Sequence, residues 1–173
     1  MRVHIATDHA GLDLSQYLVE RLVAAGYDLV DHGPETYDAL DDYPAFCISA
    51  ALAVREERER GLDSLGIVLG GSGNGEQIAA NKVVGIRAAL AWSLDTARLA
   101  RQHNDAQVVA LGGRQHSQEE ALAIVEAFLA EPFSGDERHV RRIGQIAEYE
   151  ATGAVAGKLE DLRPREYPAA REA

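Results

Sequence analysis

Residues 65–76 carry the sequence LGIVLGGSGNGE, in which a short apolar run passes directly into a glycine-rich segment. An apolar run of this length, bounded by turn residues, is typical of a buried strand. Four glycines within residues 70–75 let a backbone approach a ligand closely, and a segment of helical character follows them. The order strand, glycine loop, helix therefore predicts a β-α unit with its loop at the carboxyl end of the strand.

The same alternation extends over most of the chain. Apolar runs predict strands at residues 3–6, 28–30, 65–69, 86–91 and 107–111. Segments of helical period predict helices at residues 11–25, 43–60, 75–82, 93–103 and 117–130. We expect an α/β protein, a Rossmann-like three-layer α/β/α sandwich with a five-stranded parallel sheet. Its ligands should bind beyond the carboxyl ends of the strands.

Two C-terminal segments lie outside this alternation. Residues 136–150 predict an extra helix with apolar residues along one side. From residue 152 the chain mixes Gly and Pro with charges and shows little periodicity, which predicts a flexible tail. We therefore expect one domain over residues 1–151 and a tail over residues 152–173.

The composition excludes several classes of protein. Hydrophobic residues make up 46% of the 173 residues, too large a share for a disordered chain. A net charge of −11 argues against binding to nucleic acid or to an anionic membrane. The single cysteine, Cys47, excludes an intrachain disulfide or a cysteine zinc cage, and we expect a buried, inert thiol. Because we find no membrane-spanning run and no signal peptide, we expect a soluble, cytoplasmic protein.

The glycine-rich segment does not match the common phosphate-loop or nucleophile motifs. A Walker loop needs Lys-Ser or Lys-Thr after its last glycine, where this chain has Glu76-Gln77. A dinucleotide fingerprint would need glycine at position 76, and a nucleophile elbow would need glycine at position 74. A tight turn without a ligand is the simpler interpretation, but four glycines at the mouth of a parallel sheet favour a ligand site. The candidate binding residues of the segment are Gly71, Ser72, Gly73, Asn74 and Gly75.

Other candidate residues lie at the ends of predicted strands and helices. Asp8 and His9 follow the first strand and Arg114 follows the fifth, so these side chains should reach the same edge of the sheet. His103 and Asn104 end a helix, where a cation at the helix dipole and an Asn cap explain them without a ligand.

Basic residues gather near the start of the last predicted helix. Arg138 and Arg142 are four residues apart, so they share one helix face and could grip a phosphate together, with His139 beside them. A solvated charged face paired with carboxylates remains an equal alternative. We expect Trp92 to be a packing residue, and no His and carboxylate residues have the spacing typical of a metal site.

Several separate motifs occur in one order within residues 1–150. They are Asp8-His9-Ala10-Gly11, Asp42-Tyr43-Pro44, residues 70–75 continuing into Ala79-Ala80-Asn81-Lys82, Gly85-Ile86-Arg87-Ala88, His103-Asn104 and Gly113-Arg114. Together they resemble the ribose-5-phosphate isomerase B family, which also contains galactose-6-phosphate isomerase subunits. The resemblance implies a cofactor-independent and metal-independent isomerase of the pentose phosphate pathway. Such an enzyme interconverts ribose 5-phosphate and ribulose 5-phosphate through a cis-enediolate.

One departure from the family concerns the base. Many members carry a cysteine base at the position of Gly70, whereas here Glu76 follows the loop, as in the actinobacterial branch. The resemblance implies that Glu76 is the base, that His103 opens the sugar ring, and that Ser72 and the loop amides hold the enediolate. It implies that Asp8 binds at the ring oxygen and that Asn104 contacts the sugar hydroxyls or the enediolate. It also implies that the phosphate is bound by His9, Arg114, Arg138 and Arg142, with His139 beside them.

The resemblance also implies a homodimer or tetramer with active sites shared across the subunit interface. We therefore expect the isolated monomer to be inactive. Two alternatives stay open. The same chemistry could act on allose 6-phosphate, galactose 6-phosphate or erythrulose 4-phosphate, or the chain could be a non-catalytic module that binds sugar phosphates or nucleotides.

Overall fold

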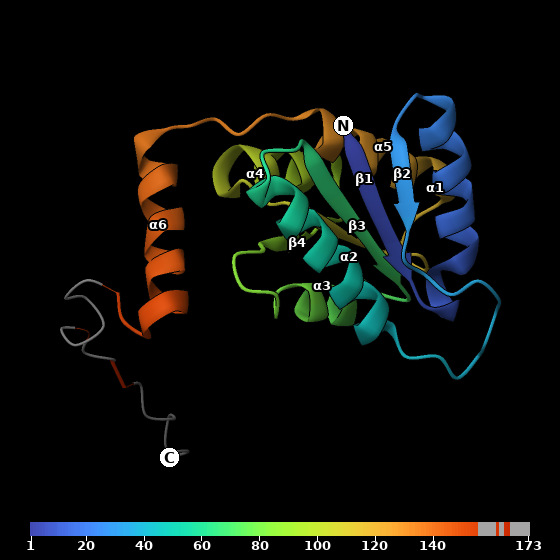
Figure 1. Cartoon of the computed structure of the whole chain (residues 1–173), viewed down its shortest axis with the longest axis horizontal. Coiled ribbons are helices and arrows are strands. Elements are labelled where there is room, and N and C mark those ends of the chain that lie inside the picture. The colour runs from blue at the N-terminus through green and yellow to red at the C-terminus, as the bar shows by residue number, and fades with distance from the viewer. Residues whose placement is uncertain (156–161, 163–164, 167–173) are drawn as a thin grey trace, which may run out of the picture.

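The computed structural model describes residues 1–155, 162 and 165–166 (Figure 1). The predicted tail therefore lies mostly outside the described residues. The elements in chain order are β1 (Arg2–Thr7), η1 (His9–Gly11), α1 (Leu12–Ala24), β2 (Asp28–Asp31), α2 (Tyr43–Glu59), β3 (Ser64–Gly70), α3 (Asn74–Ala80), β4 (Ala88–Leu90), α4 (Leu94–Asn104), β5 (Val108–Gly112), α5 (Gln118–Ala130) and α6 (Glu137–Thr152). None of the described helices is long and apolar enough to cross a membrane.

The strands form one parallel sheet in the order β2-β1-β3-β5-β4. The central strand, β3, is buried along its whole length and pairs Leu65 with Val3 of β1 and Ile67 with Val109 of β5. The predicted α/β class and five-stranded parallel sheet are confirmed. Because all strands run the same way, their carboxyl ends meet at one edge of the sheet.

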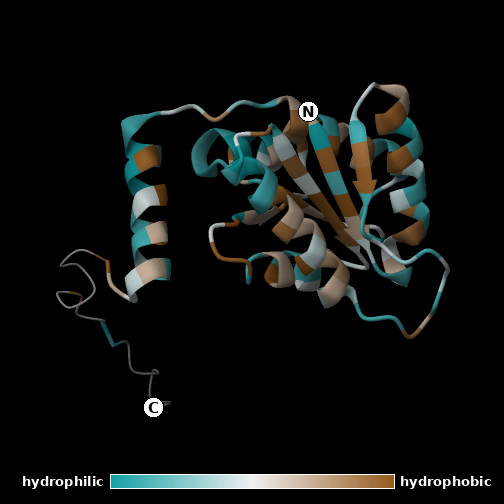
Figure 2. Cartoon of the chain, in the orientation of Figure 1, coloured by the Kyte–Doolittle hydropathy of each residue, from teal (hydrophilic) through white to brown (hydrophobic). Residues whose placement is uncertain are grey.

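Alternate residues of each strand face opposite helix layers, as the pleat of a strand requires. Ile5, Ile67 and Leu111 pack in one apolar cluster with α1, α4 and α5, whereas Val68 and Ala110 pack in a second cluster with α2 and α3. Figure 2 shows hydrophobic residues along the strands, where on β1 they alternate with hydrophilic ones. The two clusters make the three-layer sandwich.

Local signals set most of the helix ends. Ser117 and Glu120 form the expected reciprocal capping box at α5, and Gly26, with φ of 92°, follows the end of α1. The first predicted helix starts as the short η1 turn, and α3 runs over 74–80 rather than 75–82. Helix α4 ends on Asp105 in the left-handed conformation (φ 41°), so Asn104 is the last helical residue and not the cap.

Two predictions near β4 are wrong. The strand covers Ala88–Leu90 and not residues 86–91. At its start the backbone N–H of Arg87 donates to the Gln107 side chain and not to a neighbouring strand. Trp92 does not pack in the core: it is 65% exposed just beyond the end of β4.

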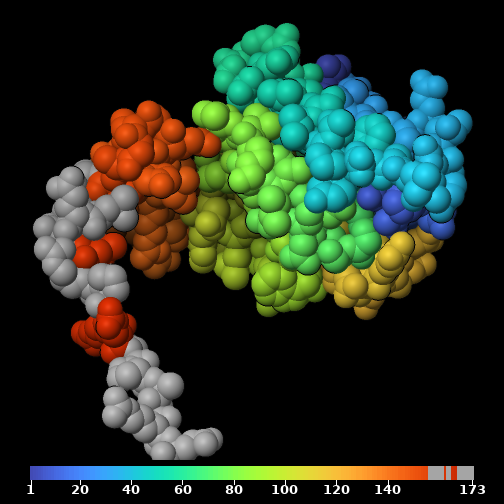
Figure 3. Space-filling view, turned by 90° about the horizontal axis from the view of Figure 1, so that it is seen from below, coloured from blue at the N-terminus to red at the C-terminus, as the bar shows by residue number. Residues whose placement is uncertain are grey.

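Helix α6 follows an extended connection from α5 and lies against one side of the domain (Figures 1 and 3). It extends two residues beyond the predicted helix, to Thr152. His139 is buried at its start, and near its end the Glu150 carboxylate accepts a hydrogen bond of 2.8 Å from the Gly85 backbone N–H. Val140, Ile146 and Tyr149 are each more than half exposed, so the described residues leave much of the apolar side of the helix uncovered.

A buried polar network joins β1 to α2. Glu57, which is 6% exposed, accepts hydrogen bonds from Arg2 at 2.9 Å and from His4 at 3.1 Å. His4 is in turn hydrogen-bonded to His32, and His32 to Ser49, each at 2.9 Å. Burial acts to raise the pKa of Glu57, but the hydrogen bonds from His4 and Arg2 outweigh it and lower this pKa to about 2.

We predict that Glu57→Gln destabilises the fold in a pH-dependent way. A folded pKa of about 2 against an ordinary value of 4.5 means that the carboxylate stabilises the folded state above pH 4.5. The variant should lose about 2–4 kcal/mol of unfolding free energy at pH 7. This difference should shrink as the pH falls from 4.5 towards 2. Denaturant unfolding at several pH values measures it, with the exposed Glu56→Gln as control. A difference that does not depend on pH would contradict the assignment.

Candidate active site

The carboxyl ends of β1, β3 and β5 bring one group of predicted site residues together. Asp8 and His9 follow β1, the glycine loop follows β3, and Arg114 follows β5. Backbone hydrogen bonds join the last two segments, from Gly113 N–H to the Gly70 carbonyl at 2.7 Å and from Arg114 N–H to the Gly71 carbonyl at 3.2 Å. The Arg114 guanidinium lies beside Gly71. These contacts fix the loop against the sheet edge.

Glu76, in the first turn of α3, points its carboxylate at Gly70. A Cβ added at Gly70 would overlap the carboxylate, so the side chain of Glu76 occupies the space that a side chain at position 70 would need. Glu76 is only 4% exposed, and burial, with a smaller contribution from Asp8, raises the pKa of its carboxyl. A buried carboxylate with a raised pKa beside hydrogen-bond donors is suited to general base catalysis.

Cys47, on α2, has its thiol close enough to Glu76 and Asp8 for their charges to act on it. Its thiol is fully buried, and burial, together with the charges of Glu76 and Asp8, raises its pKa to about 12. It therefore stays protonated near neutral pH and cannot replace a thiolate base. The sequence-based prediction of a buried thiol is confirmed.

The loop itself presents polar groups to an open hollow. Ser72 and Asn74 are exposed, and the Ser72 hydroxyl oxygen accepts from the Asn74 backbone and side-chain N–H groups at 3.4 and 3.3 Å. The hollow, of about 600 Å³, is lined by Ser72, Asn74, Trp92, Gly112 and His116 among others. Its size suits a small ligand.

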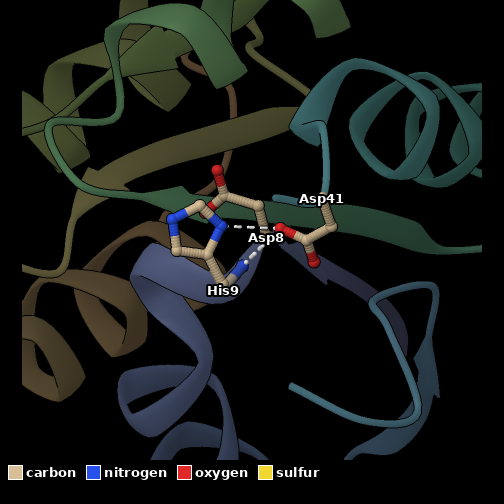
Figure 4. Close-up of side chains that lie close together, drawn as sticks. All are labelled: Asp8, His9 and Asp41. Atoms are coloured by element: carbon tan, nitrogen blue, oxygen red, sulfur yellow. Dashed lines mark hydrogen bonds and ion pairs between the residues drawn. The ribbon is translucent and has the colours of Figure 1, made fainter. Parts of the chain in front are cut away.

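His9 is paired with a residue that the sequence analysis missed. The carboxylate of Asp41 lies 2.7 Å from Nδ1 of His9, and Asp8 lies beside them (Figure 4). One nitrogen or oxygen atom from each of these three side chains lies within 4.8 Å of the others, close enough to hold a metal ion. In the described part of the chain this is the one group of His, Cys and acidic residues with that spacing. A metal ion there would have to displace the hydrogen bond between His9 and Asp41. Motif spacing could not find this group, because Asp41 comes from a loop far along the sequence.

A second group of predicted site residues gathers around the end of α4 and the start of α6. The rings of His103 and His139 stack with their centroids 4.3 Å apart, and Ser134 Oγ is hydrogen-bonded to His139 at 2.9 Å. Burial lowers the pKa of His139, and the positive charges of His103, Arg138 and Arg142 lower it further. The two exposed cations of this group are Arg138 and Arg142, beside the buried His139, and exposed cations are what an anion site requires.

The two groups lie at opposite edges of the sheet. His103 and Asn104 precede β5, and the carbonyl of Asn104 accepts from Arg87, which precedes β4. Arg114 follows the other end of β5. The five residues of β5 alone place roughly 16 Å of extended chain between these edges. No single sugar phosphate can touch both groups of one chain.

Comparisons with known proteins show the family of the chain. A sequence profile described as "Ribose/Galactose Isomerase" matches residues 3–146. The chain belongs to this family. It is 59% identical over 152 residues to "Ribose-5-phosphate isomerase B" of Mycobacterium tuberculosis, covering 88% of this chain and 91% of the relative.

Solved structures of the ribose/galactose isomerase family share the fold. The ribose-5-phosphate isomerase B of Clostridium thermocellum aligns with a TM-score of 0.82 at 39% identity, covering 89% of this chain and 100% of the other. That of Mycoplasma genitalium, solved with bound ribulose-5-phosphate, aligns with a TM-score of 0.80 at 42% identity, covering 87% and 97%. The family resemblance predicted from the motifs is confirmed.

We predict that Gly70→Ala inactivates the isomerase without unfolding it. The new methyl group would displace the Glu76 carboxylate, and a misplacement of about 1 Å can cost on the order of a hundredfold in rate. The control is Gly113→Ala, at the same sheet edge, where an added Cβ meets no atom closer than 3.5 Å. Thermal unfolding of both variants checks the fold. An active Gly70→Ala enzyme would contradict the close approach of Glu76.

Proposed function

We propose that the protein interconverts ribose 5-phosphate and ribulose 5-phosphate. The observation that carries this proposal is the buried Glu76 carboxylate held against the glycine loop. Relatives at 57–59% identity are named ribose-5-phosphate isomerase B, and the relative that holds ribulose-5-phosphate is 42% identical. Both support the same substrate pair.

Glu76 is the proposed base. Its carboxylate removes the proton from C2 of the open-chain aldose and returns a proton to C1, while a proton moves from O2 to O1 through a cis-enediolate. The raised pKa of Glu76 makes the carboxylate a better proton acceptor than an exposed one. No electrons leave the substrate in this isomerisation, so the proposal requires no redox cofactor. It requires no metal because Glu76 and the hydrogen-bond donors of the loop supply the proton transfer.

The glycine loop is the proposed enediolate site. N–H groups of Gly71–Gly75 and the Ser72 hydroxyl lie at the start of α3, where donors stabilise developing negative charge. Both observed contacts of Ser72 use its oxygen as the acceptor, so its hydroxyl hydrogen is available to donate. Asp8, which is buried and whose charge acts on Glu76, is the proposed group at the ring oxygen.

A second copy of the chain completes the proposed site. In this arrangement His103 and Asn104 of one copy meet Glu76 of the other, and Arg138 and Arg142 join His9 and Arg114 around the phosphate. The exposed apolar side of α6 supports it, as does a cleft of about 580 Å³ between α6 and the sheet edge. The cleft is lined in part by Ile86, Leu90, Trp92, Leu99 and Ile146. A two-fold dimer would bury this cleft and build two equivalent sites.

The remaining sequence-based predictions belong to the same proposal. They are a homodimeric or tetrameric assembly, a cytoplasmic location, a role in the pentose phosphate pathway and activity without metal. Full turnover after treatment with a chelator would support the last of these.

We predict that Glu76→Gln lowers the turnover of ribose 5-phosphate by at least about a thousandfold, because the amide cannot accept the C2 proton. In the wild type, kcat/KM should fall as the pH drops through a value above the ordinary 4.5, since the base must be ionised. The exposed Glu126→Gln serves as the matched control. Assays with allose 6-phosphate and galactose 6-phosphate run alongside. A wild type that turns over allose 6-phosphate or galactose 6-phosphate but not ribose 5-phosphate would contradict the proposed substrate. An active Glu76→Gln variant would contradict the assignment of Glu76 as the base.

A further inference from the structure

Asp41 makes two hydrogen bonds to one residue. Its Oδ1 accepts from Nδ1 of His9 at 2.7 Å and from the backbone N–H of His9 at 3.0 Å. The imidazole is therefore fixed relative to its own backbone, with its Nδ1 hydrogen committed to the carboxylate. Figure 4 shows the other ring nitrogen of His9 pointing away from Asp41. Nε2 is thus the ring atom left to meet a ligand.

The pair is partly withdrawn from solvent. The side chain of Asp41 is only 10% exposed and that of His9 is 25% exposed. The second oxygen of Asp41, Oδ2, is buried and has no hydrogen-bond partner within the described part of the chain. An unsatisfied buried carboxylate oxygen costs stability, so a purely structural role does not explain this arrangement well.

Three charged side chains surround His9, each from a different segment. Asp8 faces it from the end of β1, Asp41 from the loop before α2, and Arg114 from beyond the end of β5. The hydrogen bond to Asp41 is the largest cause that raises the pKa of His9, ahead of the opposing effect of burial and the charge of Asp8. Arg114 acts in the opposite sense and lowers this pKa. Without Asp41, the Arg114 guanidinium would act on His9 unopposed by this carboxylate and would favour a neutral imidazole.

We propose that Asp41 is a positioning residue for the substrate phosphate, which holds His9 as an oriented imidazolium whose Nε2–H donates to the phosphate oxygens. The inference rests on the isomerase function proposed above. Asp41 touches neither the substrate nor the reacting carbons. It acts through His9, and it offsets the positive charge of Arg114 so that both cations can bind one dianion.

The test begins with the wild type, in which NMR titration of the histidine ring signals gives the pKa of His9. A value above the ordinary 6.5 is expected, and a value at or below 6.5 overturns the proposal. This measurement needs neither a variant nor catalytic activity. It therefore separates a failure of this inference from a failure of the proposed reaction.

Asp41→Asn then removes the charge while keeping an oxygen that can accept from the His9 backbone N–H. The pKa of His9 should fall by about one unit or more. KM for ribose 5-phosphate should rise about tenfold at pH 8 and much less at pH 6, while kcat stays within about twofold. Binding of inorganic phosphate, measured by calorimetry, should weaken in the same pH-dependent way.

Two further variants complete the test. Glu35→Gln removes one exposed carboxylate from the same loop and should leave the pKa of His9 and KM unchanged. In a His9→Asn background, Asp41→Asn should have no further effect on KM. Equal effects of Asp41→Asn and Glu35→Gln would overturn the proposal, as would additive effects of Asp41→Asn and His9→Asn.

Discussion

The close approach of Glu76 to Gly70 is the contact on which the rest of the site depends. The carboxylate lies where a side chain at position 70 would lie, so a base at one position excludes a side chain at the other. The family resemblance places a cysteine base at position 70 in many members. The structure gives a physical reason why this chain carries glycine there together with glutamate at position 76. The parallel sheet brings Asp8 and Arg114 to the same edge, because β1 and β5 flank β3.

The sheet that brings Asp8, Glu76 and Arg114 to one edge also separates them from the other residues of the proposed site. A helix that returns to the start of a parallel strand must end at the amino edge of the sheet, so His103 and Asn104 cannot reach Glu76 of their own chain. Helix α6, with its exposed apolar residues and its arginines, contacts His103 and Gly85 at that same edge. The proposal of a second copy rests on these three observations.

The sequence predicted the fold well, because apolar alternation, capping boxes and glycine stops are local signals. The capping box of Ser117 and the strand at residues 65–69 are examples, and both are confirmed. Predictions from local sequence were wrong where contacts between distant residues set the structure. The Gln107 side chain shortens β4, and Trp92 is exposed at a sheet edge where its apolar ring predicted packing. Among the site residues, Asp41 was missed because only the folded loop brings it to His9. The contact between residues 70 and 76 was equally hidden, since spacing alone does not show where a side chain points.

Mixing two inactive variants tests most directly whether two copies share each site. Glu76→Gln and His103→Asn disable opposite halves, so a mixed dimer would hold one intact site and one doubly disabled site. Equal mixing with free exchange should restore about a quarter of wild-type activity in a two-fold dimer. Mixing Glu76→Gln with Asp8→Asn should restore none, because both lie in the same half. Absence of activity in the first mixture, despite mass-spectrometric proof of mixed dimers, would contradict the shared site.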